Sequence, residues 1–235
     1  MSWRCSGQTN AQLIANLVNA NLLTTVRVIS AFNQTDRADF LSPLSGGSPY
    51  QDAPLYLDFG ATISAPHMHA VCTEALAPSL VEGARVLDVG SGSGYLCAIF
   101  ARLVGPSGYV EGVEHVLELV TRANGVLDRT LPPALRATIN NHVGDGRVAA
   151  TIGGGGGFDA IHVGAAALRN HIPIFVKNLR PGGRLVVPVN TPLGDQDLII
   201  VERPLDGSLP FEKAICGVRY VPLTDLGAQV GGGIV

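Results

Sequence analysis

The chain has few charged residues, few aromatic residues and no long hydrophobic run. Charged residues make up 15% of its 235 residues, aromatic residues 6%, and the formal net charge at pH 7 is −3. This balance lacks the basic excess of nucleic-acid-binding proteins and predicts no nucleic-acid partner. Nowhere do 18 apolar residues follow one another, so the sequence predicts no membrane-spanning helix. Hydrophobic residues nevertheless reach 46%, enough for one sizeable core and too many for a disordered chain.

Cysteine is also scarce. Cys5, Cys72, Cys97 and Cys216 lie far apart, without a CxxC pair or a disulfide framework. Cys97 falls in an apolar helical pattern, where we expect a buried free thiol. The first residues, MSWRCSGQTN, lack the apolar core of a signal peptide, and the final GGGIV carries no lipidation or retention signal. We therefore expect a reducing compartment, most simply the cytoplasm.

From residue 85 onward, expected strands and helices alternate. The strands are RVLDVG (85–90), GYVEGVE (108–114), ATINNHVG (137–144), FDAIHVG (158–164) and PGGRLVVPV (181–189). The helices are YLCAIFARLV (95–104), HVLELVTRANGVL (115–127), with Leu117, Val120 and Leu127 on one side, and PIFVKNL (173–179). Repeated βα units predict an α/β fold, a mostly parallel, doubly wound sheet with helices on both faces. DLIIVERP (197–204) and AICGVRYVPL (214–223) are expected to add antiparallel strands.

The first 80 residues or so read as an extension that helps to build a substrate site. Apolar residues recur at helical spacing over residues 10–23, and a second short helix is expected over 26–32. A loop rich in Ser, Gly and Pro follows, and then the extended segments of LYLDFGATIS (55–64). Pro66 suits the first position of a helix to about residue 76, because its missing N–H would be unpaired there anyway. We expect one domain, with a core over about 81–225 and a flexible surface turn at the glycines of 153–157.

The turn GSGSG (90–94) lies where the first strand of the core meets a helix. Ligands of open α/β sheets lie at the carboxyl ends of the strands, and glycines let the backbone approach them closely. Dinucleotide sites use GxGxxG and hold a pyrophosphate on the helix N-terminus. Here the spacing is GxGxG, and Asp88 precedes it by two residues. An aspartate beside that turn suits a cationic amine better than a pyrophosphate.

Two further acids stand at the ends of the next two strands. Glu114 follows Gly94 by 20 residues and can accept hydrogen bonds from both hydroxyls of a ribose. Asp145, in GDGR, can accept from the exocyclic amine of an adenine. Adenine, ribose and an amino acid together indicate S-adenosylmethionine, while NAD stays open as an alternative. Each acid also has a structural interpretation: Asp88 as a partner of the turn's backbone, Glu114 as a helix-start residue and Asp145 as a turn former.

The stretch ATISAPHMHA (61–70) holds a second group of candidates. His67 and His69 are two residues apart and do not share a helix face, and no third ligand is evident, so we expect no metal. Ser64, just before the expected helix, either caps it or serves the acceptor.

With these residues in place, the chain resembles the protein-L-isoaspartate (D-aspartate) O-methyltransferases. The resemblance rests on ATISAPHMHA, LDVGSGSG, VGDGR, FDAIHVGAAA, LRPGGRLVVPV and YVPLTD, and extends from about Leu13 to Thr224. It implies a Rossmann-like class I S-adenosylmethionine-dependent methyltransferase fold. It also implies a repair enzyme that methylates the α-carboxylate of L-isoaspartyl residues, and the β-carboxylate of D-aspartyl residues, in damaged proteins and peptides. Family members are usually monomers, and we expect a monomer here.

The resemblance also implies roles for individual residues. Ser64 is the implied active-site residue, the glycine turn and Asp88 are to hold the methionyl part, and Thr224 and Gln229 are to close over the cofactor. The residues implied to surround the cofactor are Ala61, Thr62, Ile63, Ser64, His69, Asp88, Gly90, Ser91, Gly92, Ser93, Gly94, Glu114, His115, Asp145, Gly146, Thr224 and Gln229. Two regions depart from the relatives: the loop at 42–48 looks longer, and the tail after Gln229 lacks the aromatic and basic ending of animal relatives.

Three other functions stay open. A methyltransferase of the same fold acting on a small molecule or a nucleic-acid base is the nearest, although HVGAAA replaces the Asn/Asp-Pro-Pro-aromatic motif of base methylation. An NAD-dependent oxidoreductase is the second. The third is a binding module without turnover, against which Ser64 and the three acids argue.

Overall fold

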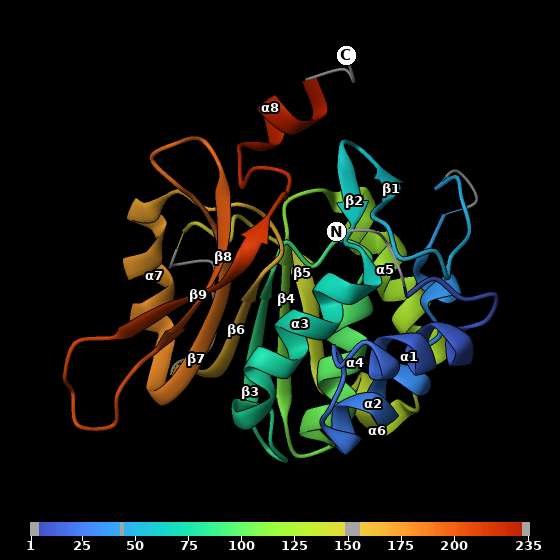
Figure 1. Cartoon of the computed structure of the whole chain (residues 1–235), viewed down its shortest axis with the longest axis horizontal. Coiled ribbons are helices and arrows are strands. Elements are labelled where there is room, and N and C mark those ends of the chain that lie inside the picture. Colours follow the sequence, from blue (N-terminus) through green and yellow to red (C-terminus); the bar gives the residue numbers. More distant parts are fainter. Residues whose placement is uncertain (1–4, 43–44, 149–155, 232–235) are drawn as a thin grey trace.

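The computed structural model describes residues 5–42, 45–148 and 156–231. A seven-stranded sheet runs through the molecule in the order β5-β4-β3-β6-β7-β8-β9, and a separate hairpin, β1-β2, stands above one end of it (Figure 1). The strands are β1 (Leu55–Asp58), β2 (Ala61–Ile63), β3 (Arg85–Val89), β4 (Tyr109–Glu114), β5 (Ile139–Val143), β6 (Phe158–Val163), β7 (Leu179–Asn190), β8 (Gln196–Glu202) and β9 (Phe211–Val218).

Helices cover the sheet and build the amino-terminal part of the chain. The α-helices are α1 (Asn10–Asn19), α2 (Val26–Asn33), α3 (Pro66–Leu76), α4 (Tyr95–Val104), α5 (Leu117–Thr130), α6 (Pro133–Arg136), α7 (Ile172–Asn178) and α8 (Leu226–Gly231). Short 3₁₀ helices cover Arg37–Phe40, Ala77–Ser79 and Arg169–His171. Among the described residues, no helix combines the length and the apolar composition that a membrane crossing requires.

The direction of the strands confirms the doubly wound fold. Strands β5, β4, β3, β6 and β7 are parallel to their neighbours, whereas β8 and β9 add in antiparallel fashion. The chain leaves β3 toward β4 and β5 on one side and later returns to β6 and β7 on the other. This reversal lies beside β3, so the carboxyl ends of β3, β4 and β6 mark the expected ligand crevice.

Alternate residues of the strands feed two separate hydrophobic cores, one on each face of the sheet. Val86 and Val110 pack with helices α1 to α5. Leu87, Val89 and Val113 pack on the opposite face, where α7 supplies Phe175. Because side chains alternate along a strand, burial on both faces explains why these runs are almost wholly apolar.

The structure corrects several local predictions. The first helix ends at Asn19, and Asn21 has a left-handed φ of 58° that the apolar spacing did not reveal. Leu117 is 61% exposed, because it opens α5 on the solvent side. Ser64 does not cap α3, whose N-cap residue is Ala65, without a side-chain cap. Of the flexible turn predicted at the glycines of 153–157, residues 153–155 lie outside the described part of the chain.

Candidate active site

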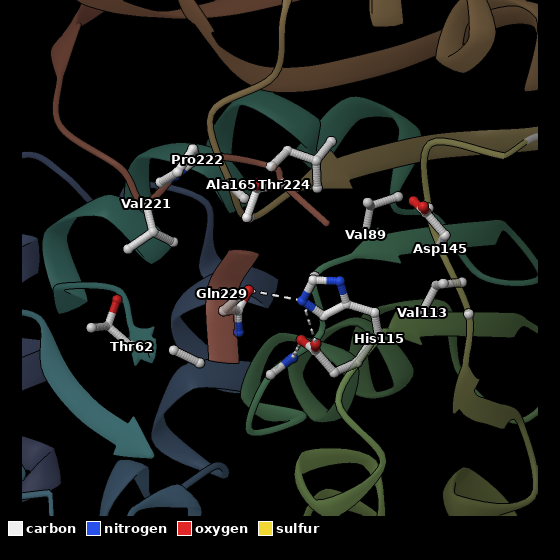
Figure 2. Close-up of a pocket in the computed structure, with 18 residues that line it drawn as sticks. Thr62, Val89, Val113, His115, Asp145, Ala165, Val221, Pro222, Thr224 and Gln229 are labelled. Carbon is white, nitrogen blue, oxygen red and sulfur yellow. Dashed lines mark hydrogen bonds and ion pairs between the residues drawn. The ribbon is translucent and has the colours of Figure 1, made fainter. Parts of the chain in front are cut away.

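A pocket opens where the carboxyl ends of β3, β4 and β5 meet the β1-β2 hairpin and the last described residues of the chain (Figure 2). In this view Thr62, Gln229, His115 and Asp145 surround a common space, although they come from four distant parts of the sequence. The lining residues are Ala61, Thr62, Val89, Gly90, Gly92, Val113, Glu114, His115, Gly144, Asp145, Gly146, Gly164, Ala165, Val221, Pro222, Leu223, Thr224 and Gln229.

The glycine turn gives this pocket a backbone wall. Gly90, Gly92 and Gly94 have φ values of 74°, 50° and 78°, a left-handed region in which other residues are strained. Gly90 and Gly92 line the pocket. Gly94 instead faces α5, where an added Cβ would lie 3.2 Å from the Cβ of Ala123.

The two serines of the turn make structural hydrogen bonds and are not among the residues that line this pocket. The Ser91 hydroxyl donates to Oδ1 of Asn141 at 2.7 Å in a buried contact. Ser93 Oγ accepts a hydrogen bond from the backbone N–H of Tyr95 at 3.4 Å, at the start of α4. Ser91, Ser93 and Gly94 therefore make contacts that hold the shape of the turn, and their predicted cofactor contacts stay predictions.

Glu114 connects the glycine turn to the next helix while bordering the pocket. Its Oε2 accepts from the N–H of Gly92 and its Oε1 from the N–H of Val116, each at 3.1 Å. The residue is only 6% exposed. A carboxylate has about four lone-pair sites, so these bonds leave room for two ribose hydroxyls. This placement suits the role predicted for Glu114.

Asp145 lines the pocket at the end of β5 and is tied to Arg147, a residue that the sequence did not single out. Arg147 donates through Nε to Oδ1 at 2.9 Å and through Nη2 to Oδ2 at 2.7 Å. These hydrogen bonds lower the pKa of Asp145. Arg147 Nη2 also lies 2.5 Å from Asp225, just before α8. Neighbouring Gly146 fits because an added Cβ would lie 2.3 Å from Val89.

Asp88 is the most deeply buried of the three acids. Its side chain is 2% exposed and lies outside the pocket lining. Oδ1 lies 2.7 Å from Nδ1 of His162, its register partner on β6, and Oδ2 accepts from the Cys97 thiol at 3.4 Å. Burial alone would lower the pKa of His162, but the hydrogen bond with the Asp88 carboxylate raises it to about 10. Asp88 and His162 thus form a buried ion pair beneath the glycine turn, and the predicted contact of Asp88 with the cofactor amine stays a prediction.

The segment after β2 supplies the acceptor side. Ala61 and Thr62 line the pocket, whereas Ile63 is 3% exposed and belongs to the core. Ser64 is half-buried and follows the pocket-lining Thr62 by two residues. The predicted active-site serine therefore lies close to the pocket, although it is not among the lining residues.

The two histidines of this segment have separate structural roles. His67 Nδ1 lies 2.8 Å from Oδ1 of Asp52, which also accepts the His67 N–H. His69 is 6% exposed, and its Nδ1 lies 3.4 Å from Nη1 of the fully buried Arg37. Burial, with Arg37 nearby, holds the pKa of His69 well below its ordinary value. His69 is a neutral core residue outside the pocket lining, and its predicted cofactor contact stays a prediction. Within the described ranges, no group of three His, Cys, Asp or Glu residues could hold a metal.

The carboxy-terminal residues close one side of the pocket. Gln229 Oε1 lies 2.8 Å from Nε2 of His115, and Gln229 Nε2 donates to the carbonyl of Phe59 at 3.0 Å (Figure 2). Gly60 allows this approach, because an added Cβ would lie 2.9 Å from the Gln229 carbonyl oxygen. Thr224 also lines the pocket, so Thr224, Gln229 and His115 all lie where a cofactor contact was predicted.

Sequence reasoning missed the wall formed by residues 221–223 and Ala165. The Ala166 N–H donates to the Val221 carbonyl and the Leu223 N–H to the Ala166 carbonyl, both at 2.8 Å. The segments FDAIHVGAAA and YVPLTD stand out in the sequence only as family motifs, because their apolar residues do not indicate a ligand. Their meeting depends on the fold.

Three comparisons with known proteins find the same family. The family described as Protein-L-isoaspartate(D-aspartate) O-methyltransferase matches residues 8–228. A protein-L-isoaspartate O-methyltransferase of Triticum aestivum is 42% identical over 225 residues, covering 95% of this chain and 94% of the relative. One from Caenorhabditis elegans is 38% identical and covers 95% and 96%. The crystal structure of a putative enzyme of this name from Plasmodium falciparum, in complex with S-adenosyl-L-homocysteine, superposes with a TM-score of 0.80. It is 29% identical, and the match covers 93% of this chain and 99% of that one.

Proposed function

The chain belongs to the protein-L-isoaspartate(D-aspartate) O-methyltransferase family, and from this premise we propose how its residues carry out the reaction. The enzyme transfers the methyl group of S-adenosylmethionine to the free α-carboxylate of L-isoaspartyl residues in damaged proteins and peptides. The observation that carries the proposal is the shared pocket, in which the strand-end acids meet the segment that carries Ser64.

The strand ends fit S-adenosylmethionine. Glu114 is placed to accept the ribose hydroxyls, and Asp145 to accept the adenine amine. Gly90 and Gly92 offer backbone without side chains to the amino-acid part, while Asp88 and His162 hold the end of β3 from below. Thr224 and Gln229 cover the site from the carboxy-terminal side. When bound, the cofactor supplies a methyl group on a sulfonium sulfur, which an anionic oxygen can attack.

The acceptor needs no general base. A carboxylate with an ordinary pKa of about 4 is ionised at neutral pH. The protein must therefore hold one carboxylate oxygen in line with the methyl group and keep water away, which is a task of positioning. We assign this role to Ser64, whose hydroxyl donates to the acceptor carboxylate. The first backbone N–H of α3, that of His67, donates to Asp52. We therefore assign to α3 the favourable effect of its dipole on the acceptor carboxylate and not a hydrogen bond from His67.

The proposal also covers the fate of the methyl ester, the substrate range and the state of the protein. The methyl ester collapses to a succinimide without further help from the protein, and hydrolysis of the succinimide returns part of it to normal aspartate. We extend the substrate range to the β-carboxylate of D-aspartyl residues. We also propose that the chain acts as one domain and as a monomer in the cytoplasm.

A pair of peptides tests this function. The enzyme is incubated with methyl-labelled S-adenosylmethionine and either of two peptides that differ only in an isoaspartyl or a normal aspartyl linkage. We expect a base-labile methyl ester on the isoaspartyl peptide alone. Equal labelling of both peptides, or of neither while a small molecule is methylated, would contradict the proposal.

A further inference from the structure

The N-terminus of α3 is capped by a side chain from another part of the chain. Its N-cap residue, Ala65, makes no side-chain hydrogen bond, and its first residue, Pro66, has no backbone N–H to donate. Asp52 supplies the cap instead. Its Oδ1 accepts the backbone N–H of His67 at 2.9 Å and lies 2.8 Å from Nδ1 of the same residue. One carboxylate oxygen therefore holds both the backbone and the ring of His67.

The Asp52 carboxylate is a buried, charged acceptor. Its side chain is 3% exposed, and its backbone N–H donates to Oγ of Ser6 at 3.0 Å. Burial alone would raise the pKa of Asp52, but the hydrogen bonds from His67 and the nearby charge of Arg37 lower it below its ordinary value. Asp52 is therefore ionised at neutral pH. A negative charge is favourable at a helix N-terminus, and an ionised acceptor forms stronger hydrogen bonds than a neutral one.

Ser64 lies in a short connection that is fixed on both sides. Before it, Ile63 ends β2 and pairs with Leu55 at the start of β1. After it, His67 is bound by Asp52, which precedes Leu55 by three residues. The stretch that begins at Asp52 and ends at Leu55 therefore holds the chain both before and after Ser64.

We propose that Asp52 is a positioning residue, which fixes the start of α3 through His67 and so holds the Ser64 hydroxyl toward the acceptor carboxylate. The proposal rests on the proposed function, because it presumes that Ser64 donates to that carboxylate. Positioning is sensitive to small movements, since a displacement of about 1 Å can lower a rate about 100-fold. A cap that served stability alone would leave the rate of the folded enzyme unchanged.

Two substitutions of Asp52 test this role. Asp52→Ala and Asp52→Asn are compared with wild type for kcat and KM toward an isoaspartyl peptide. Asp52→Asn keeps a neutral oxygen that can accept the His67 N–H, so it is the milder variant. Each kcat is expressed per molecule that binds S-adenosylhomocysteine, counted by calorimetry, so that unfolded protein does not lower the value.

Thr9→Ala is the matched control. The Thr9 hydroxyl caps α1 by accepting the backbone N–H of Gln12 at 3.2 Å, and Thr9 is not among the residues that line the pocket. Its loss should lower the melting temperature, as the loss of a helix cap does, and leave kcat unchanged. The control thus separates the effect of a lost cap from the effect of a displaced Ser64.

We expect Asp52→Ala to lower kcat about 10-fold and Asp52→Asn about 3-fold, with S-adenosylhomocysteine affinity within about 2-fold of wild type. In the Ser64→Ala background, Asp52→Asn should cause no further loss of kcat, because the group that Asp52 positions is already gone. Wild-type kcat in both Asp52 variants, or a loss in Asp52→Asn that persists in the Ser64→Ala background, would overturn this inference alone. A wild-type enzyme that leaves the isoaspartyl peptide unmethylated would overturn the proposed function as well.

Discussion

The pocket has a methyl-donor side, at the ends of β3, β4 and β5, and a methyl-acceptor side, at the β1-β2 hairpin and the segment after it. These two sides are built in different ways. On the donor side, at the ends of β3, β4 and β5, contacts join residues that are close along the chain or in adjacent strands. Gly92 and Glu114 are separated by 22 positions, and Asp145 and Arg147 by two. On the acceptor side, Cys72 contacts Tyr220 across 148 positions, and Phe59 contacts Gln229 across 170.

The chemistry of the two sides differs as well. The donor side holds buried charge, because Asp88 and Glu114 are 2% and 6% exposed and each has polar partners. The acceptor side carries uncharged hydroxyl groups, that of Thr62, which lines the pocket, and that of Ser64, two residues further along the chain. A buried charge that loses its partner costs folding free energy, whereas a hydroxyl that faces a reacting group affects turnover. Substitutions on the donor side should therefore reduce stability or cofactor affinity, and those on the acceptor side should reduce rate.

The largest effect is expected at Asp88. Asp88→Ala leaves the protonated His162 buried without its carboxylate and should lower the free energy of unfolding by about 3–5 kcal/mol. Urea denaturation at pH 7 measures this loss. As a control, Asp128→Ala removes an acid that is 62% exposed in its pair with Arg136 and should cost less than about 1 kcal/mol. A weaker cofactor affinity at unchanged stability would show instead that Asp88 holds the ligand directly.

The same ion pair predicts a pH dependence of stability. The pKa of His162 is about 10 in the folded protein, above its ordinary value of 6.5. Between these values the folded state binds more protons than the unfolded state, so this contribution is complete below pH 6.5 and falls as the pH rises toward 10. Urea midpoints from pH 6 to 10 should fall more steeply for wild type than for Asp88→Ala. Parallel curves would contradict a protonated His162.

Ser64→Ala should have the next largest effect, on rate alone. Loss of one donor to the reacting group is expected to lower kcat about 100-fold, with S-adenosylhomocysteine affinity within about 2-fold of wild type. Steady-state kinetics and calorimetry separate the two quantities. Ser107→Ala removes an exposed hydroxyl that donates to Glu82 far from the pocket and should leave both unchanged. Equal losses of rate and affinity in Ser64→Ala would mean that Ser64 serves the donor side too.

Glu114→Gln should weaken cofactor binding by about 10-fold, because a charged acceptor is replaced by a neutral one with a single carbonyl oxygen. Calorimetric titration with S-adenosylhomocysteine checks this, and kcat at saturating cofactor should change far less than for Ser64→Ala. Glu118→Gln, an exposed position in the first turn of α5, is the matched control and should bind as wild type does. Unchanged affinity of Glu114→Gln would remove Glu114 from the ribose site.

The smallest effect is expected where the two sides meet. Asp225 is 79% exposed in its pair with Arg147, so Asp225→Ala should weaken cofactor affinity only about 2- to 5-fold. The difference from wild type should shrink at high salt, because exposed pairs are screened. Glu212→Ala breaks an exposed pair with Arg169 away from the pocket and should have no effect on affinity. A loss that persists at high salt would indicate a direct ligand contact by Asp225.

The donor side was the more predictable of the two from sequence. The strand, turn and helix over 85–104 follow from local patterns, and Gly90, Gly92 and Gly94 take the left-handed conformations that such a turn needs. Glu114 and Asp145 line the pocket as expected, because parallel strands end at the same edge of the sheet. Asp88 shows the limit of this reasoning, since register on β3 sets its place but its facing partner, His162, lies on β6.

Sequence alone determined the alternation of strands and helices, the glycine turn and the strand ends at which acids gather, because these depend on residues a few positions apart and on the period of the strand. Tertiary structure alone decided that His69 is a core residue, that Asp88 pairs with His162, that Tyr220 reaches Cys72 and that Gln229 reaches Phe59. The physical reason is that a buried polar side chain must find a hydrogen-bond partner, and packing brings that partner from a distant part of the chain.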